Sequence, residues 1–258
     1  SKMFNIPVIE HPQDTKLTEG GTMNEGFYST KLGMQGMPSI AEDIIVSRDI
    51  RILEYIGGQL HIQHISSAKA IDMVRMAKDK GLHVTAEATP HHFSFTDSAL
   101  ETFDPNLKMN PPLRSEEDRN AVIKGLKDGT IDAIATDHAP HVIDDKEGEF
   151  DKAAFGVTGL ETAVGAYFTE LVDKHNFNGI KMLVDLCVVN PRRIMHLQVP
   201  EIKEGTVADL CILNPEINWT VKKEEFFSKA VNSCFLGRTL HGKVVGVVGK
   251  RRIWMSGA

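Results

Sequence analysis

The sequence lacks several features that would place it in a specialised class of protein. No apolar run approaches the roughly 20 residues that cross a bilayer, and the net charge of -6 gives no excess of positive charge for nucleic acid or an anionic membrane. Its three cysteines, Cys187, Cys211 and Cys234, are far apart and form no Cys-x-x-Cys pair. We therefore expect buried, reduced thiols, a cytoplasmic location, and no nucleic-acid or membrane partner.

What is present is typical of a globular protein. The 258 residues are 41% hydrophobic and 25% charged, which is ordinary for a chain that buries a substantial core. The first residues run directly into an apolar strand, with no initiator methionine, signal peptide or helix cap. This beginning predicts that the chain starts in the middle of a fold.

Strand-like and helix-like segments alternate up to about Pro200. Ser39 and Glu42 predict a capping box at the start of a helix that Gly57 ends, and Ser67 predicts the cap of the next helix. A long segment without periodicity, residues 15–37, predicts a loop. The expected strands are residues 6–10, 60–65, 83–88, 107–110 and 131–136, and the other expected helices are residues 115–126, 160–175 and 180–195.

This alternation predicts an α/β fold with a parallel sheet or barrel over residues 1–200. After Pro200 the pattern changes to short strand-like runs, at residues 207–213, 244–248 and 251–254. Residues 201–258 are therefore expected to form a small all-β segment appended to the α/β part.

Three of the expected strands end in residue types that bind metals: His11, His64 and Asp137. Active sites of α/β barrels gather where strands end, and two neutral imidazoles with a carboxylate suit zinc. Each residue alone is as readily explained by a hydrogen bond or a helix cap, so the convergence of three strand ends carries the hypothesis. His61 and His64 are three apart, so strand alternation predicts that at most one of them faces inward.

Asp137 lies in the segment Ala-Thr-Asp-His-Ala-Pro-His, which ends at His141. A carboxylate held at a metal can accept a proton from water and return it to a leaving amide nitrogen. His141 lies one turn further on and could contact an anionic substrate, although a solvated loop histidine is an equally good interpretation of this residue alone.

Four motifs resemble those of the dihydroorotases, and together they cover most of the chain in the family's order. Two are specific: Ala-Thr-Asp-His-Ala-Pro-His at residues 135–141 and Lys-Met-Asn-Pro-Pro-Leu-Arg at residues 108–114. Gln-His-Ile-Ser-Ser-Ala-Lys at residues 63–69 and Phe-Gly-Val-Thr-Gly-Leu-Glu-Thr at residues 155–162 are similar to two further motifs of the family.

The resemblance implies the C-terminal half of a (β/α)8 TIM-type barrel, strands five to eight, with part of a small β domain. It implies one or two zinc ions: His11 and His64 would hold one, and Asp137 would bind the other and act as the acid/base. Asn110 and His141 would bind the substrate carboxylate, and the backbone at Phe155 and Gly156 would contact the pyrimidine ring.

The activity that the resemblance implies is hydrolysis of a cyclic amide. Dihydroorotase interconverts N-carbamoyl-L-aspartate and (S)-dihydroorotate in de novo pyrimidine biosynthesis. Hydantoinases and allantoinases share the fold and the ligands, but their substrates have no ring carboxylate for Asn110 and His141 to bind. A non-catalytic dihydroorotase-like subunit is a further alternative, although the ligand positions that this chain contains are all filled.

The family's N-terminal ligands have no counterpart in the sequence. The His-x-His pair of strand one, the arginine after it, and the bridging residue of strand four are missing. The residues after His11 also depart from the family, with Pro12 and Gln13 in place of Cys-Glu. We therefore expect the chain alone to be inactive and to need its missing half. The resemblance also implies a homo-oligomer or association with aspartate transcarbamoylase.

Overall fold

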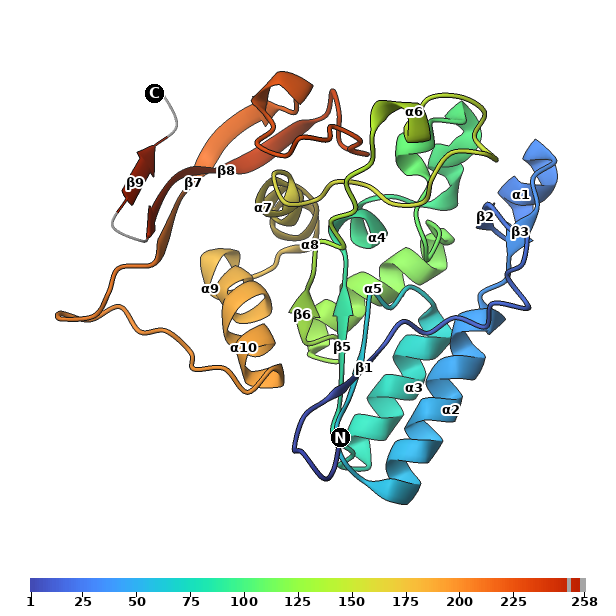
Figure 1. Cartoon of the computed structure of the whole chain (residues 1–258), viewed down its shortest axis with the longest axis horizontal. Helices are drawn as coiled ribbons and strands as arrows, with labels where there is room; N and C mark the ends of the chain where they lie inside the picture. The colour runs from blue at the N-terminus through green and yellow to red at the C-terminus, as the bar shows by residue number, and fades with distance from the viewer. Residues whose placement is uncertain (250–251, 256–258) are drawn as a thin grey trace.

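A four-stranded parallel sheet lies at the centre of the molecule (Figure 1). The computed structural model describes residues 1–249 and 252–255. The strands are β1 (Val8–Glu10), β4 (Leu60–Ile62), β5 (Val84–Ala88) and β6 (Ala133–Ile134), in the order β1-β4-β5-β6. All three pairings are parallel, so the carboxyl ends of the four strands meet at one edge of the sheet.

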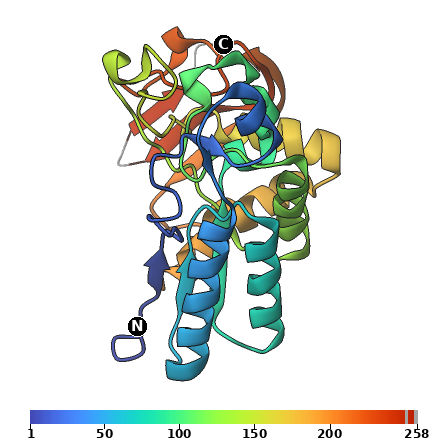
Figure 2. The same cartoon turned by 90° about the vertical axis from the view of Figure 1, so that its right-hand side faces the viewer.

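Helices cover one face of this sheet and bury the main core against it. Helix α2 (Ile40–Ile56) packs beside α3 (Ala68–Asp79), and α3 also contacts α5 (Glu116–Asp128) (Figures 1 and 2). In β5 the alternate residues Val84, Ala86 and Ala88 are buried, whereas the residues between them are only half-buried. The alternation follows from the pleat, which directs every second side chain toward the helices.

The other face of the sheet carries polar residues and is more open. His61 of β4 contacts Thr85 and Glu87 of β5 across this face. On the outermost strand, β1, the side chains of Val8 and Ile9 are 48% and 43% exposed. The edge strand of this sheet therefore leaves apolar side chains on the molecular surface.

The segment between β1 and α2 is more structured than the sequence predicted. Instead of a loop, residues 15–37 contain β2 (Met23–Asn24), α1 (Phe27–Leu32) and β3 (Gly36–Met37), with β2 parallel to β3. Elements this short show no periodicity in a sequence. The predicted capping box is also wrong: α2 begins after Ser39, but the Ser39 side chain makes no cap hydrogen bond, and the Glu42 carboxylate bonds Ser66 instead of the Ser39 backbone.

Residues 107–110 do not form the strand that the sequence predicted. The 3-10 helix η2 (Pro105–Leu107) occupies part of the segment, and an extended loop with a cis Asn110–Pro111 peptide follows it. Proline has no N–H to donate to a strand ladder, so the two prolines after Asn110 do not support sheet pairing.

The remaining helical segments are short. The predicted helices over residues 160–175 and 180–195 are present, each with a π-helical turn inside. The elements are α4 (Pro90–Ser94), η1 (Asp97–Thr102), α6 (Ile143–Lys146), α7 (Ala163–Ala166), η3 (Tyr167–Val172), α8 (Asp173–His175), α9 (Gly179–Val184), η4 (Asp185–Val189) and α10 (Asn190–Ile194).

A second, antiparallel sheet forms from the end of the chain (Figure 1). Its strands are β7 (Leu210–Thr220), β8 (Thr239–Gly249) and β9 (Arg252–Met255), with η5 (Lys223–Glu225) between the first two. This confirms a β segment after residue 200, except that Arg251, part of the third expected strand, lies outside the described residues. The sheet packs on the helical part through close contacts of β8 with α7 and η3.

The cysteines depart from expectation, because Cys187 and Cys211 are exposed and only Cys234 is buried. All three are free thiols, and burial raises the pKa of Cys234 to about 12. Across residues 1–249 and 252–255, every helix is too short or too polar to cross a bilayer.

Candidate functional site

Two of the predicted ligands, His11 and His64, lie side by side at the carboxyl edge of the central sheet. His11 directly follows β1, and His64 follows β4 by one residue. Their ring centroids are 4.5 Å apart and the rings are edge to face. His64 is 5% exposed, and its Nδ1 atom is buried without a hydrogen-bond partner.

Electrostatics keep His64 neutral at ordinary pH. Burial, together with the neighbouring His11, lowers the pKa of His64 to about 4, against the opposing effect of Asp137 and Glu87. A neutral imidazole with a buried, unbonded nitrogen is the form that binds a metal. Asp137 lies close enough to act on His64 from the end of β6, where it has a left-handed φ of 46°.

The alternation of side chains along β4 does not decide which of His61 and His64 faces the site. The strand ends at Ile62, and His64 has a φ of 29°, so the alternation does not extend to it. His61 is satisfied within the sheet: its Nδ1 lies 2.8 Å from Thr85 Oγ1, and its Nε2 lies 3.0 Å from Glu87 Oε2. His64, not His61, is therefore the histidine beside His11.

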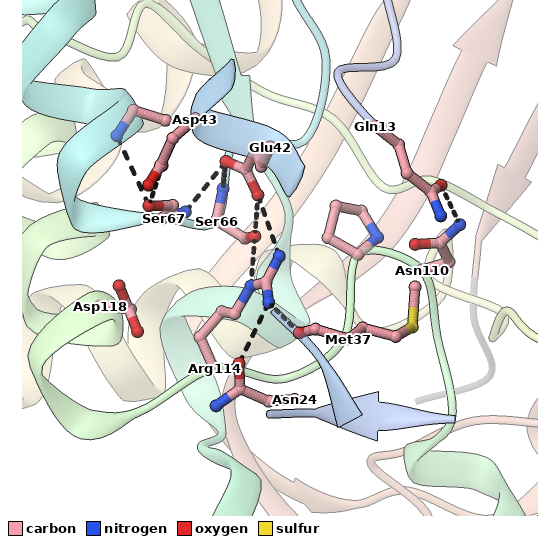
Figure 3. A network of polar contacts seen from close by, with 12 residues as sticks. Gln13, Asn24, Met37, Glu42, Asp43, Ser66, Ser67, Asn110, Arg114 and Asp118 are labelled. Atoms are coloured by element: carbon pink, nitrogen blue, oxygen red, sulfur yellow. Dashed lines mark hydrogen bonds and ion pairs between the residues drawn. The ribbon is translucent and has the colours of Figure 1, made fainter. Parts of the chain in front are cut away.

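Asn110 joins this group through Gln13 (Figure 3). The Asn110 Nδ2 atom donates to Gln13 Oε1 at 2.7 Å, and His11 Nε2 lies 2.9 Å from the same oxygen. The structure thus brings together His11, His64 and Asn110. The bond between Gln13 and Asn110 alone spans 97 residues of the sequence.

A buried ion pair between Arg114 and Glu42 holds the loops of this site (Figure 3). Arg114 is 5% exposed and Glu42 is 2% exposed, so both charges are removed from water. The Glu42 carboxylate accepts hydrogen bonds from the backbone N–H groups of Ser66 and Ser67 and from the Ser66 hydroxyl, which fixes the turn after His64.

Arg114 extends this network to the segment before α2. Its guanidinium donates to Ser66 Oγ at 3.1 Å, to Asn24 Oδ1 at 3.0 Å and to the Met37 carbonyl at 2.9 Å. Since every nitrogen of the guanidinium has a partner, the buried charge is well compensated, and loss of either member of the ion pair leaves the other charge unpaired. We define Arg114, Glu42, Ser66, Asn24 and the Met37 carbonyl as the Arg114 network.

His141, Phe155 and Gly156 form a second group of predicted site residues. The His141 Nε2 atom lies 2.9 Å from the Phe155 carbonyl. The buried Lys146 ammonium donates to the carbonyls of Ala154 and Gly156 at 2.8 and 3.0 Å and so holds the same loop. Burial, with the nearby charge of Lys108, lowers the pKa of Lys146 to about 8. His141 is connected to Asp137 by the short segment after β6.

The His11 and His64 side chains fit part of a metal site. Among the described residues no group of three His, Cys, Asp or Glu side chains converges on one point that could hold a metal. The His11 and His64 pair fits two positions of a tetrahedral zinc site, because both are imidazoles and His64 has an unbonded buried nitrogen. Further ligands have to come from outside this pair.

The parallel α/β sheet with polar residues at its carboxyl edge occurs in many families, and comparison with known families identifies the one to which this chain belongs. The chain belongs to the amidohydrolase family, whose model matches residues 46–245. It is 47% identical over 246 residues to a dihydroorotase from Syntrophus aciditrophicus, covering 95% of this chain and 57% of that protein. It is 44% identical over 256 residues to a dihydroorotase from Endomicrobium trichonymphae, covering 98% of this chain and 60% of that protein. The chain thus spans less than two thirds of the curated relatives it matches.

Solved structures show the same fold. L-hydantoinase from Arthrobacter aurescens superposes with a TM-score of 0.86 at 24% identity, covering 98% of this chain and 57% of that one. D-hydantoinase from Thermus sp. gives a TM-score of 0.84 at 21% identity, covering 100% of this chain and 59% of that one. At this identity the likeness describes the fold alone.

Sequence reasoning missed the residues that support the site. The capping-box spacing assigns Glu42 to the start of a helix, and the motif that ends at Arg114 gives this arginine no role. Gln13 stands out in the sequence only as a departure from the family. The motif that ends at Arg114 could have marked this arginine as a candidate for a structural role. Its partners could not be identified from the sequence, because they lie up to 90 residues away.

Proposed function

We propose that the chain is the C-terminal part of a dihydroorotase, which interconverts N-carbamoyl-L-aspartate and (S)-dihydroorotate in pyrimidine biosynthesis. The observation that carries the proposal is the placement of His11, His64 and Asn110 in one group at the carboxyl edge of the sheet. Identities of 44–47% to dihydroorotases over nearly the whole chain support it.

In this proposal the four parallel strands are strands five to eight of a (β/α)8 barrel, over residues 1–200. Residues 201–258, which contain the antiparallel sheet, contribute part of a small β domain. The exposed apolar side chains of β1 support this arrangement, because the missing strands would cover them. We call the chain joined to, or mixed with, its N-terminal half the complete barrel.

His11 and His64 would hold one zinc ion, and Asp137 would bind a second and carry the proton. Bound zinc supplies Lewis-acid polarisation at such a site. The Asp137 carboxylate accepts a proton from the attacking water and returns it to the ring nitrogen as the amide bond breaks.

The substrate would be oriented by the remaining residues. Asn110 has a second amide N–H that it does not donate to Gln13 and that can donate to the substrate carboxylate. His141 would donate its Nε2–H, which bonds the Phe155 carbonyl in the structure, to the carboxylate instead. The Phe155–Gly156 backbone would lie against the ring. A carboxylate grip of this kind favours dihydroorotate over hydantoin or dihydrouracil, which have no carboxylate.

Substitution of Asp137 tests the proton-transfer role. In the complete barrel, Asp137→Asn should reduce kcat for dihydroorotate by at least about 10²-fold, because an amide cannot accept the proton. The matched control is Asp144→Asn, a change of the same kind at an exposed carboxylate seven residues on. Equal activity of the two variants would exclude the role assigned to Asp137.

A substrate panel and a zinc determination test the reaction and the metal. The wild-type complete barrel should contain zinc and should turn over dihydroorotate much faster than hydantoin or dihydrouracil. A preference for hydantoin would indicate a hydantoinase, and a folded protein without zinc or turnover would indicate a non-catalytic subunit.

A further inference from the structure

Gln13 lies between His11, a proposed zinc ligand, and Asn110, a proposed substrate contact. Figure 3 shows its bond to Asn110. Its Oε1 atom lies 2.9 Å from His11 Nε2 and 2.7 Å from Asn110 Nδ2. Its Nε2 atom lies 2.6 Å from Thr18 Oγ1, and that hydroxyl lies 3.2 Å from the Asp14 carbonyl. Every polar atom of the Gln13 side chain therefore has a partner.

The chemistry of these partners fixes the direction of each hydrogen bond. A backbone carbonyl only accepts, so the Thr18 hydroxyl donates its single hydrogen to Asp14 and must accept from the Gln13 amide nitrogen. The Gln13 oxygen then faces His11 and Asn110 and accepts from both. Thr18 thus sets the orientation of the Gln13 amide.

The same logic assigns the tautomer of His11. Because Gln13 Oε1 can only accept, His11 Nε2 must carry the hydrogen, and the neutral ring then has its lone pair on Nδ1. A histidine that binds a metal typically donates its other ring N–H to an acceptor, which fixes the ring orientation. Nδ1 is therefore the nitrogen of His11 that is available to zinc.

We propose that Gln13 is a positioning residue that couples zinc binding to substrate binding. Its one amide oxygen holds His11 with Nδ1 free for zinc and also holds the Asn110 amide that is to bind the substrate carboxylate. The inference rests on the proposed function and extends it to a residue that contacts neither the zinc nor the substrate.

An acceptor, whether neutral or charged, is what both tasks require at this position, since the residue that usually stands here in dihydroorotases is a glutamate. A carboxylate would accept from His11 and would strengthen that bond. It would also accept from the Asn110 amide, and so would keep both groups in place. The role of Gln13 can therefore be tested by one substitution that removes the acceptor and one that keeps it.

The experiment measures zinc affinity and steady-state kinetics of the complete barrel. Gln13→Met removes the acceptor, and we expect zinc affinity, measured by competition with a chelator, to fall about 10–100-fold. Gln13→Glu keeps the acceptor for both His11 and Asn110, so zinc affinity and KM for dihydroorotate should stay within a few-fold of wild type, whereas Gln13→Met should also raise KM. Thr18→Val removes the group that orients the amide and should weaken zinc binding in the same direction as Gln13→Met.

Two controls separate positioning from a general loss of structure. Gln35→Met changes the same residue type in the same segment, where the amide bonds only the Glu19 carbonyl, and should leave zinc affinity and KM unchanged. In a His11→Ala background, Gln13→Met should cause no further loss of zinc affinity, because its effect passes through His11.

The outcomes also distinguish this inference from the proposed function. If the wild-type complete barrel binds no zinc and does not turn over dihydroorotate, the proposed function fails. If wild type does both, but Gln13→Met and Thr18→Val retain wild-type zinc affinity, only the role of Gln13 is overturned. An additive effect of Gln13→Met in the His11→Ala background would also overturn it.

Discussion

Replacement of Gly156 by alanine is a sharp test of how closely the two substrate-facing loops approach. Gly156 has a φ of +114°, and an added Cβ would lie 2.5 Å from Ala139 Cβ and 3.3 Å from His141 Nε2. The backbone conformation costs an L-residue about 1–3 kcal/mol. The overlap with Ala139 adds about 1–3 kcal/mol, as for other overpacked sites.

Gly148 provides the matched control in the same region of the chain. Its φ is +127°, but a Cβ added there would meet no atom within 4 Å, so Gly148→Ala has the backbone cost without the overlap. We expect Gly156→Ala to lower the free energy of unfolding by about 1–3 kcal/mol more than Gly148→Ala. Adding Ala139→Gly to Gly156→Ala should recover most of that difference, because it removes the atom at 2.5 Å.

Urea unfolding of the complete barrel measures these free energies, and steady-state kinetics measure the functional effect. Gly156→Ala should also raise KM for dihydroorotate, because it displaces His141, which is bonded to the adjacent Phe155 carbonyl. Equal destabilisation by Gly156→Ala and Gly148→Ala, or no recovery with Ala139→Gly, would refute the close approach.

Three further predictions concern pH, substrate binding and assembly. Burial lowers the pKa of His92 to about 3, so below pH 6.5 the unfolded chain binds a proton that the folded chain does not. The free energy of unfolding should therefore decrease as pH falls from 6.5 toward 3, by up to about 1.4 kcal/mol per pH unit from this group, and His92→Gln should have a shallower slope in urea titrations at pH 7, 6 and 5. Asn110→Ala and His141→Ala should each raise KM for dihydroorotate at unchanged zinc content, and their effect should be smaller for an analogue without the carboxylate; loss of zinc would instead identify them as ligands. Residues 1–258 alone should associate and lack turnover, because the apolar side chains of β1 are exposed; a monomer in sedimentation with full activity would contradict this.

The sequence was sufficient for the α/β class of the fold and for the placement of His11 and His64 side by side. Alternating apolar strands and amphipathic helices predicted the α/β sheet, because both patterns are local. His11 and His64 could be predicted as neighbours because parallel strands bring their carboxyl ends to one edge. The Asp137 role, by contrast, remains a proposal that depends on the dihydroorotase resemblance.

What could not be predicted depends on long-range contacts. The sequence around Glu42 has the spacing of a capping box, but its carboxylate is more strongly bound by Ser66, Ser67 and Arg114, none of which is local. Residues 107–110 have the composition of a strand, but the neighbouring prolines and tertiary contacts favour an extended loop. At both Glu42 and residues 107–110, tertiary contacts therefore override the local structure that the sequence pattern predicts.

The Arg114 network has a consequence for the order in which the chain can acquire its structure during synthesis. The arginine bonds Asn24 and Met37 across separations of 90 and 77 residues. A ribosome adds roughly 5–20 residues per second, so the segment before α2 waits several seconds for its anchor. During that interval it has neither a guanidinium partner nor local periodicity to hold it. The segment before α2 therefore cannot make these contacts until Arg114 has left the exit tunnel.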